Sequence, residues 1–138
     1  MSSFAAVLVM NVLFGTQDTE QYTNAYAQAQ ENGKPLVVLV GAEWCPGCVK
    51  MKNQVVPVMR SNGTLEKIQF AQVNTDNDPE LAEQLMRGQS IPQLIMYVKT
   101  DTGWKRSQMT GPKSVSEVES FIQSNSRQPT FRLTSTSK

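Results

Sequence analysis

Two cysteines, Cys45 and Cys48, are the residues of this 138-residue chain whose type and spacing could do redox chemistry. They lie in the stretch GAEWCPGCVK, directly after Trp44, with Pro46 and Gly47 between them. The pair could be a dithiol-disulfide couple, half of a metal site, or a local disulfide that never reacts. Histidine is absent from the sequence, which removes the commonest general base and the commonest metal ligand.

Each alternative to redox chemistry meets a specific obstacle. A structural zinc site needs four Cys or His ligands, and this chain has two cysteines and no histidine. Only a metal site shared between subunits stays possible, and we expect no metal. Covalent haem attachment needs a histidine directly after the second cysteine, and that residue is Val49. An inert disulfide stays possible, although so short a loop stabilises by less than the ~3 kcal/mol of a loop of about 15 residues.

Length and charge bound the class of protein. One domain is the default at this length, and it can bury a core without disulfides or metal. Lys and Arg total 13 against 12 for Asp and Glu, with no block of like charge. Such a chain has no electrostatic footprint for a nucleic acid, so we expect protein or small-molecule partners.

Hydrophobic periodicity predicts an alternation of helices and strands. The run LVVLV at 36–40 is apolar at every position, as in a strand covered by helices on both faces. A helix capped by Asp18 or Thr19 precedes it, and the helix that the cysteines open follows it. We expect Pro57 to kink or end that second helix. The later elements are a strand at 68–73, a helix capped by Asp78, a hairpin turning at 101–103 and a helix capped by Ser114.

The order of these elements is β-α-β, then α, then β-β-α. It predicts an α/β fold with a central mixed β-sheet of four to five strands, flanked by helices on both faces. We place the domain at 18–125, between an apolar segment at 1–17 and a Ser- and Thr-rich flexible tail at 126–138.

The apolar segment allows two interpretations. It is shorter than the roughly 18 to 20 residues of a spanning helix, so it is either a first β-strand or the trimmed remnant of a signal or anchor. Together with the polar tail it favours an extracytoplasmic location, periplasmic or membrane-anchored, with a cytoplasmic one as the alternative.

The position of the cysteines favours function over structure. They follow a buried strand and open a helix, which is where open α/β sheets bind ligands. The helix start stabilises a thiolate at Cys45. Cys48 lies one turn further on, at a Cα separation of about 5 to 6 Å that suits a disulfide. Pro46 suits the first helical turn, and Gly47 leaves access to the sulfurs.

Several motifs together resemble the thioredoxin superfamily. AEWCPGC is similar to its active site, NTDNDPELAEQL to the segment after its third strand, SIPQLIMY to its cis-proline loop and TGPKSVSEVESFI to its terminal helix. The likeness covers about residues 18–124. The stretch NGKP before the strand, with Lys50 and Met51 after the site, is similar to exported single-domain members. It is also similar to the C-terminal domain of the bacterial thiol-disulfide interchange transporter.

The resemblance implies reduction or exchange of disulfides in proteins, with Cys45 as the nucleophile and Cys48 as the resolving thiol. It implies a monomer that works with protein disulfide substrates and a thiol reductant or electron-donor protein, and no cofactor beyond its own disulfide. Pro92 matches the cis-proline, which would expose the backbone of Ile91 to a substrate strand. Gly111 lets a chain approach closely.

The substrate-binding set implied by the resemblance is Trp44, Pro46, Gly47, Ile91, Pro92 and Gly111.

Two departures from the family pattern bear on mechanism. Many thioredoxins carry a buried Asp where this chain has Leu39, and Glu43 does not replace it, because Glu43 matches a surface Glu. We expect Leu39 to lie beneath the cysteine helix, close to Cys48, with no group there to take a proton. The order Cys-Pro-Gly-Cys also replaces Cys-Gly-Pro-Cys, which changes the start of the helix and hence the reduction potential. Roles as reductant, oxidant and isomerase are all open, because reduction potentials in this fold range from about -270 to -120 mV.

A hypothesis from another class is a binding module. In it, the proline edge holds an extended peptide or a partner while the cysteines stay idle or permanently bridged.

Overall fold

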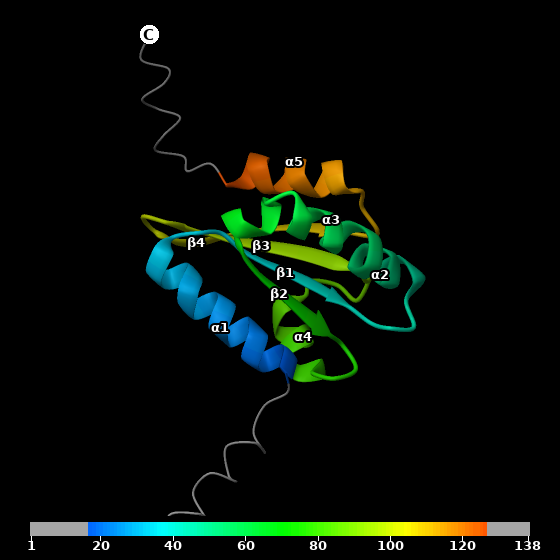
Figure 1. Ribbon diagram of the computed structural model, residues 1–138. Helices are drawn as coiled ribbons and strands as arrows, with labels where there is room; N and C mark the ends of the chain where they lie inside the picture. Colours follow the sequence, from blue (N-terminus) through cyan, green and yellow to red (C-terminus); the bar gives the residue numbers. More distant parts are fainter. Residues whose placement is uncertain (1–16, 127–138) are drawn as a thin grey trace, which may run out of the picture.

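The computed structural model describes residues 17–126, which form a four-stranded sheet with helices on both faces (Figure 1). The strands are β1 Leu36–Gly41, β2 Gln69–Asn74, β3 Gln93–Thr100 and β4 Gly103–Thr110. The helices are α1 Gln17–Asn32, α2 Pro46–Lys50, α3 Val56–Ser61, α4 Pro79–Leu85 and α5 Val115–Asn125. The predicted α/β class is confirmed. The segments predicted at 1–17 and 126–138 lie outside the described residues, apart from Gln17 and Ser126.

The sheet is mixed, and its topology decides which loops meet. Its strand order is β2-β1-β3-β4, with β1 parallel to β2 and antiparallel to β3, and β3 antiparallel to β4. Gly41, the last residue of β1, is opposite Asn74, the last residue of β2. Val40 is opposite Gln93, the first residue of β3. The loops that leave β1 and β2 and the loop that enters β3 therefore lie together at the same end of the strands.

Strand β1 is buried on both faces, as its continuous apolar run predicts. Val37 and Leu39 face a core under α3 and α5, and that core includes Met51 and Val118. Leu36, Val38 and Val40 face a second core under α1 and α4, which includes Ala29. Figure 1 shows the two helical layers on either side of the sheet. Because both of its faces are covered, β1 is a rigid base for the loop that follows it.

Helix α1 protects the outer edge of β2. The side chain of Gln21 accepts a hydrogen bond from the backbone N–H of Gln72 at 2.6 Å. Asp18 accepts one from the N–H of Asn74 at 2.7 Å. These donors would otherwise face an open sheet edge, which is a site for unwanted pairing. Asp18 and Thr19, the two residues expected to cap this helix, both lie within it, since α1 already begins at Gln17, and Asp18 bonds the strand instead.

The chain stays helical past Pro57, but its hydrogen bonding changes there. A π-helical segment, Met51–Val55, joins α2 to α3, and the N–H of Val56 donates to the carbonyl of Met51. Proline lacks an N–H and crowds the preceding turn, and a wider turn is one way in which a helix absorbs this. The expected kink or end is thus a change of helix type at Val56.

Local caps and the hairpin follow the sequence closely. Asp78 accepts a hydrogen bond from the N–H of Leu81, and Ser114 accepts one from the N–H of Glu117. In the hairpin, Thr100 pairs with Gly103 at the turn between β3 and β4.

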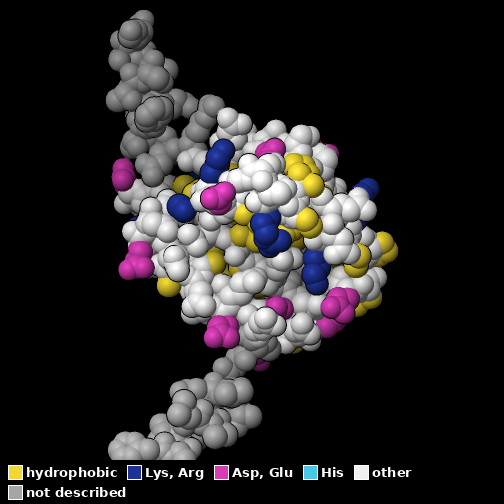
Figure 2. Space-filling model, in the orientation of Figure 1, with side chains coloured by type: hydrophobic (Ala, Val, Ile, Leu, Met, Phe, Trp, Pro, Cys, Tyr) yellow, Lys and Arg dark blue, Asp and Glu magenta, His cyan; other side chains and the backbone are white. Residues whose placement is uncertain are grey.

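Figure 2 shows acidic and basic side chains interspersed over one face of the molecule. Within residues 17–126 no helix is both long and apolar enough to cross a membrane.

Candidate active site

The two cysteines form a disulfide at the start of α2. Their Cα atoms are 5.2 Å apart, within the range that a disulfide spans. Cys45 is the N-cap of the helix, with extended backbone angles, and Pro46 follows it in the first helical turn. Proline suits that position because its missing N–H would have had no helical partner. Pro46 is exposed, whereas both cysteines are buried.

The surroundings make the two sulfurs unequal. The backbone N–H of Cys48 donates a hydrogen bond to the Sγ of Cys45 at 3.3 Å. A donor aimed at sulfur, together with the start of a helix, stabilises the thiolate over the thiol. The Sγ of Cys45 also lies 3.8 Å from the carbonyl oxygen of Ile91, at the edge where the resemblance places a substrate. This geometry suits Cys45, and not Cys48, for the attacking role.

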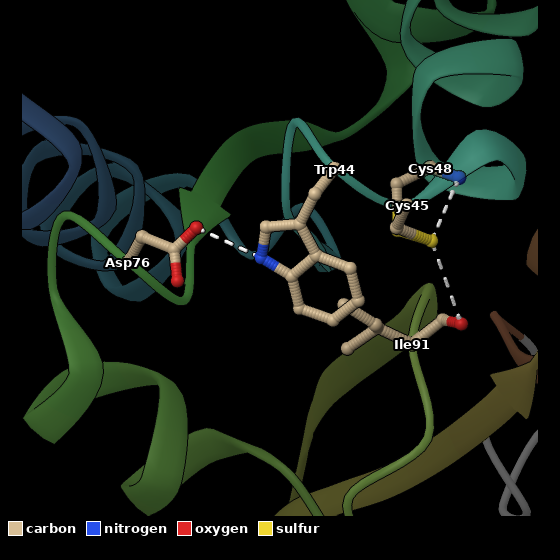
Figure 3. Close-up of a disulfide and its surroundings, with 5 residues drawn as sticks. All are labelled: Trp44, Cys45, Cys48, Asp76 and Ile91. Carbon is tan, nitrogen blue, oxygen red and sulfur yellow. Dashed lines mark hydrogen bonds between the residues drawn. A yellow bond between two sulfur atoms is a disulfide. The ribbon is translucent and has the colours of Figure 1, made fainter.

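Trp44 lies beside the disulfide with 68% of its surface exposed. Its indole Nε1–H donates to the Oδ2 of Asp76 at 2.9 Å (Figure 3). Asp76 lies in the loop after β2, and its own N–H donates to the Oδ1 of Asn74. The hydrogen bond therefore fixes the exposed ring of Trp44 against the loop after β2. The parallel pairing of β1 and β2 places this loop next to the one that carries Trp44.

The loop before β3 carries Ile91 and Pro92, where the resemblance places a substrate strand. The peptide bond between Ile91 and Pro92 is cis, and Ile91 is half-buried. Gln93, which follows Pro92, is fully buried although its side chain is polar. Its Nε2 donates to the carbonyls of Arg87 and Gly88 at 2.9 and 3.2 Å, and its Oε1 accepts from the N–H of Arg87. One buried amide thus holds both ends of the turn that presents Ile91.

Gly111 and Gly47 close the other side of the site. The N–H of Gly111 donates to the carbonyl of Pro92 at 2.8 Å, and its φ of 96° lies in the region that favours glycine. A side chain at Gly47 would meet the ring of Pro112 at 3.2 Å. Glycine is therefore favoured at 111 by its backbone angle, where a side chain would have open space, and at 47 by the close approach of Pro112.

Leu39 and Gly41 lie on the inner side of Cys48. Leu39 is 5% exposed and lines one pocket together with Cys48, so it lies beneath the cysteine helix as expected. A Cβ at Gly41 would lie 2.9 Å from both the Cβ and the Sγ of Cys48. Glycine at this position therefore makes room for the second sulfur.

The residues singled out from the sequence come together around the disulfide, although their roles in binding and catalysis stay predictions. Sequence reasoning missed Gly41, Asp76, Gln93 and Pro112. Asp76 could have been found, since a polar residue just past a strand parallel to β1 lies at the same edge. Nothing in the sequence marks Gly41, because its importance comes from a contact with Cys48.

No group of three or more potential metal ligands occurs within the described part of the chain. The cysteines are joined to each other, and the Sγ of Cys45 accepts a hydrogen bond from the backbone N–H of Cys48.

Comparisons with known proteins agree with this geometry. A family model described as thioredoxin-like matches residues 17–99. A Synechocystis sp. protein named thiol:disulfide interchange protein TxlA homolog is 29% identical over 128 residues, which cover 86% of this chain and 69% of that protein.

Solved structures share the fold. A thioredoxin from Thermus thermophilus matches with a TM-score of 0.63 and 25% identity, over 75% of this chain and 82% of that one. The protein Trxlp from Edwardsiella tarda matches with a TM-score of 0.55 and 27% identity, over 72% and 91% of the two chains.

Proposed function

Because the chain belongs to the thioredoxin-like family, we propose that it is a thiol-disulfide oxidoreductase that reduces or exchanges disulfides in protein substrates. The observation that carries the proposal is the hydrogen bond from the N–H of Cys48 to the Sγ of Cys45, at the start of α2. It activates one sulfur of a pair that already lies at disulfide distance. The name of the Synechocystis relative supports the same chemistry.

The reaction has two sulfur transfers. The Cys45 thiolate attacks one sulfur of the substrate disulfide, forms a mixed disulfide and releases the other substrate sulfur as a thiolate. The Cys48 thiolate then attacks the Sγ of Cys45, the bond from Cys45 to the substrate breaks, and the second substrate sulfur leaves. Two electrons pass to the substrate, and the protein keeps the Cys45–Cys48 disulfide.

A thiol reductant or an electron-donor protein returns the pair to the dithiol by the reverse exchange. No further cofactor is needed, because the cysteine pair itself carries the electrons.

Substrate binding uses the edge beside the disulfide. An extended substrate segment would pair with the backbone of Ile91, whose carbonyl is 3.8 Å from the Sγ of Cys45. The exposed ring of Trp44 offers apolar area on one side. Pro92, Gly111 and Gly47 line the edge without long side chains, so a substrate backbone can come close to the sulfurs.

The test is disulfide reduction with insulin as the substrate and dithiothreitol as the electron source. We expect the wild type to accelerate the reaction and Cys45→Ser to abolish it. Cys48→Ser should make a first attack and then stop, leaving a mixed disulfide through Cys45 that survives until a thiol is added. A redox titration of the wild type against glutathione then gives the direction in which the couple works.

An inactive wild type that still binds extended peptides, with its disulfide intact under dithiothreitol, would overturn the proposal. That outcome would favour a thioredoxin-like binding module whose cysteines are idle.

A further inference from the structure

The pocket that Leu39 and Cys48 line reaches Cys48 from the side away from Trp44 and Ile91. It has a volume of about 560 Å³ and lies at the carboxyl ends of β1 and β2, between the start of α1 and the cysteine helix. Cys48, Leu39 and Gly41 line it, whereas Trp44 and Ile91 do not. Solvent can therefore meet the resolving thiol through a route that a bound substrate does not cover.

The floor of this pocket carries no charge. Leu39 and Gln72 are direct partners in the pairing of β1 with β2, and both line the pocket. A thiolate at Cys48 would gain nothing from an apolar side chain or a neutral amide, and burial alone raises the pKa of a thiol. Any compensating positive charge must come from the walls.

Three charged residues line the pocket within the described part of the chain: Asp18 of α1, Glu43 of the loop before α2, and Lys52 of the π-helical segment. The carboxylate of Asp18 is directed at β2, where it accepts the N–H of Asn74 at 2.7 Å. Glu43 is exposed. Both acids would oppose a thiolate at Cys48, so Lys52 is the one cation in this set that could favour it.

Lys52 is in the right place on the helix. It follows Cys48 by four residues, and the helical bonding continues between them, since the N–H of Met51 donates to the carbonyl of Cys48. Residues four apart on a helix lie on the same face with Cβ atoms about 5 to 6 Å apart. The Lys52 side chain is long and exposed and it lines the pocket, so the ammonium can approach the sulfur.

We infer that Lys52 is the electrostatic partner of Cys48 and favours the thiolate that resolves the mixed disulfide. This inference rests on the proposed function. Cys48 gives its proton to solvent in the pocket, and the thiolate attacks the Sγ of Cys45. The leaving substrate thiolate takes up a proton from solvent, so charge and electrons balance. Lys52 supplies a positive charge, which Leu39 and Gln72 lack, and it transfers no proton.

The test measures the pKa of Cys48 as the only cysteine, in a Cys45→Ser background. The ultraviolet absorbance of the thiolate is followed against pH, with the variant lacking both cysteines as the blank. We expect Lys52→Met to raise the pKa of Cys48 by ~0.5 to 1 unit, which is modest because the cation is exposed. Lys52→Arg should restore it. Lys50→Met is the matched control, since Lys50 is an exposed lysine of the same helical stretch that does not line the pocket.

Neutralising the acids should act in the opposite direction. Asp18→Asn, which keeps an oxygen for the N–H of Asn74, and Glu43→Gln should each lower the pKa of Cys48 or leave it unchanged. In the protein with both cysteines, Lys52→Met should slow decay of the mixed disulfide ~3- to 10-fold at neutral pH, in proportion to the lost thiolate.

The two proposals fail in different ways. A wild type that reduces insulin, with a Cys48 pKa that Lys52→Met moves no more than Lys50→Met does, would overturn the role of Lys52 alone. An inactive wild type would overturn the proposed function, whatever the pKa of Cys48. Thermal unfolding of each variant guards against a structural cause, and a shifted pKa that Lys52→Arg does not restore would also refute the role of charge.

Discussion

Trp44 and Asp76 are joined by a hydrogen bond between residues 32 positions apart in the sequence. Trp44 lies in the loop after β1 and Asp76 in the loop after β2, and these strands are parallel, so the two loops leave the sheet at the same end of the strands. The bond holds a mostly exposed indole beside the disulfide. Under the proposed function, an exposed aromatic ring that is fixed in this way would contact a protein substrate.

Asp76→Ala should weaken the handling of protein substrates while sparing the sulfur chemistry. A side-chain hydrogen bond contributes about 0.5 to 1.5 kcal/mol, so we expect KM for insulin to rise by at most ~10-fold. The rate with a small aromatic disulfide should stay the same. Asp101→Ala removes an exposed aspartate from the β3–β4 turn and is the control for charge. Equal loss with both substrates would mean that Asp76 supports the cysteines and not the ring.

Gly41→Ala should disturb Cys48 directly. The added methyl would lie 2.9 Å from two side-chain atoms of a buried residue, and overpacking of this kind costs about 1 to 3 kcal/mol. Urea unfolding of the oxidised protein measures the loss. Gly47→Ala adds the same methyl against the ring of Pro112 at 3.2 Å, on the outer side of the site, and should cost less. The reverse order of stability would show that the inner contact is not tight.

Leu39→Asp should add an ionisation to the resolving step. The carboxyl would be buried beneath the cysteine helix, so desolvation would raise its pKa and let it accept the Cys48 proton above neutral pH. Lost packing and the buried polar group should cost about 2 to 5 kcal/mol. Stopped-flow decay of the mixed disulfide against pH measures the effect.

Leu39→Asn is the matched control for Leu39→Asp, with similar size and no ionisation. The wild type should show no such group. Fast wild-type decay governed by a group titrating near pH 6 to 8 would show that another acid serves Cys48.

Gln93→Met should loosen the turn that presents Ile91. It leaves the N–H of Arg87 and the carbonyl of Gly88 without the amide of Gln93, while the carbonyl of Arg87 keeps its bond from Gln108, and the cost should be about 1 to 3 kcal/mol. Hydrogen exchange at 86–91 should speed up, and activity with insulin should fall. Gln108→Met also removes a bond to the carbonyl of Arg87, from a more exposed position, and should have a smaller effect. Similar exchange rates in both variants would contradict a special role for Gln93.

Glu119 gives the fold an acid-sensitive contact. Hydrogen bonds from Thr64 and then Asn62 lower the pKa of its carboxyl below the usual 4.5. A lowered pKa in the folded state means that this stabilisation is present above the unfolded pKa and is lost as the pH falls through the folded one. Wild-type stability should therefore drop in the acid range below 4.5 by more than that of Glu119→Gln. Parallel urea midpoints for the two proteins between neutral and acid pH would contradict this.

The sequence by itself determined the class of fold and the centre of the site. The continuous apolar run of β1 predicts burial on both faces, and the caps at Asp78 and Ser114 place helix starts to within a residue. These features depend on neighbours in the chain, so local patterns carry them. The Cys45–Cys48 pair is equally local, since a spacing of three on a helix already brings the Cα atoms within disulfide range.

Only the tertiary structure decided what surrounds the sulfurs. The parallel pairing of β1 with β2 brings Asp76 to Trp44, and the antiparallel start of β3 brings Ile91 to Cys45. Asp18 reads as a helix cap in the sequence, yet it bonds the edge of β2, because α1 lies along that strand. These contacts join residues 32 to 56 positions apart, and no local pattern encodes such pairs.

The same holds for Gly41 and Lys52. Gly41 matters because Cys48 occupies the space that a side chain would fill. Lys52 matters because Leu39 and Gln72 on the floor of the pocket are uncharged, so that a positive charge near Cys48 has to come from a residue of the pocket wall. A sequence names each residue, but the free energy of a buried thiolate depends on which charges and volumes lie within a few ångströms of the sulfur. That arrangement exists only once the sheet has brought its loops together.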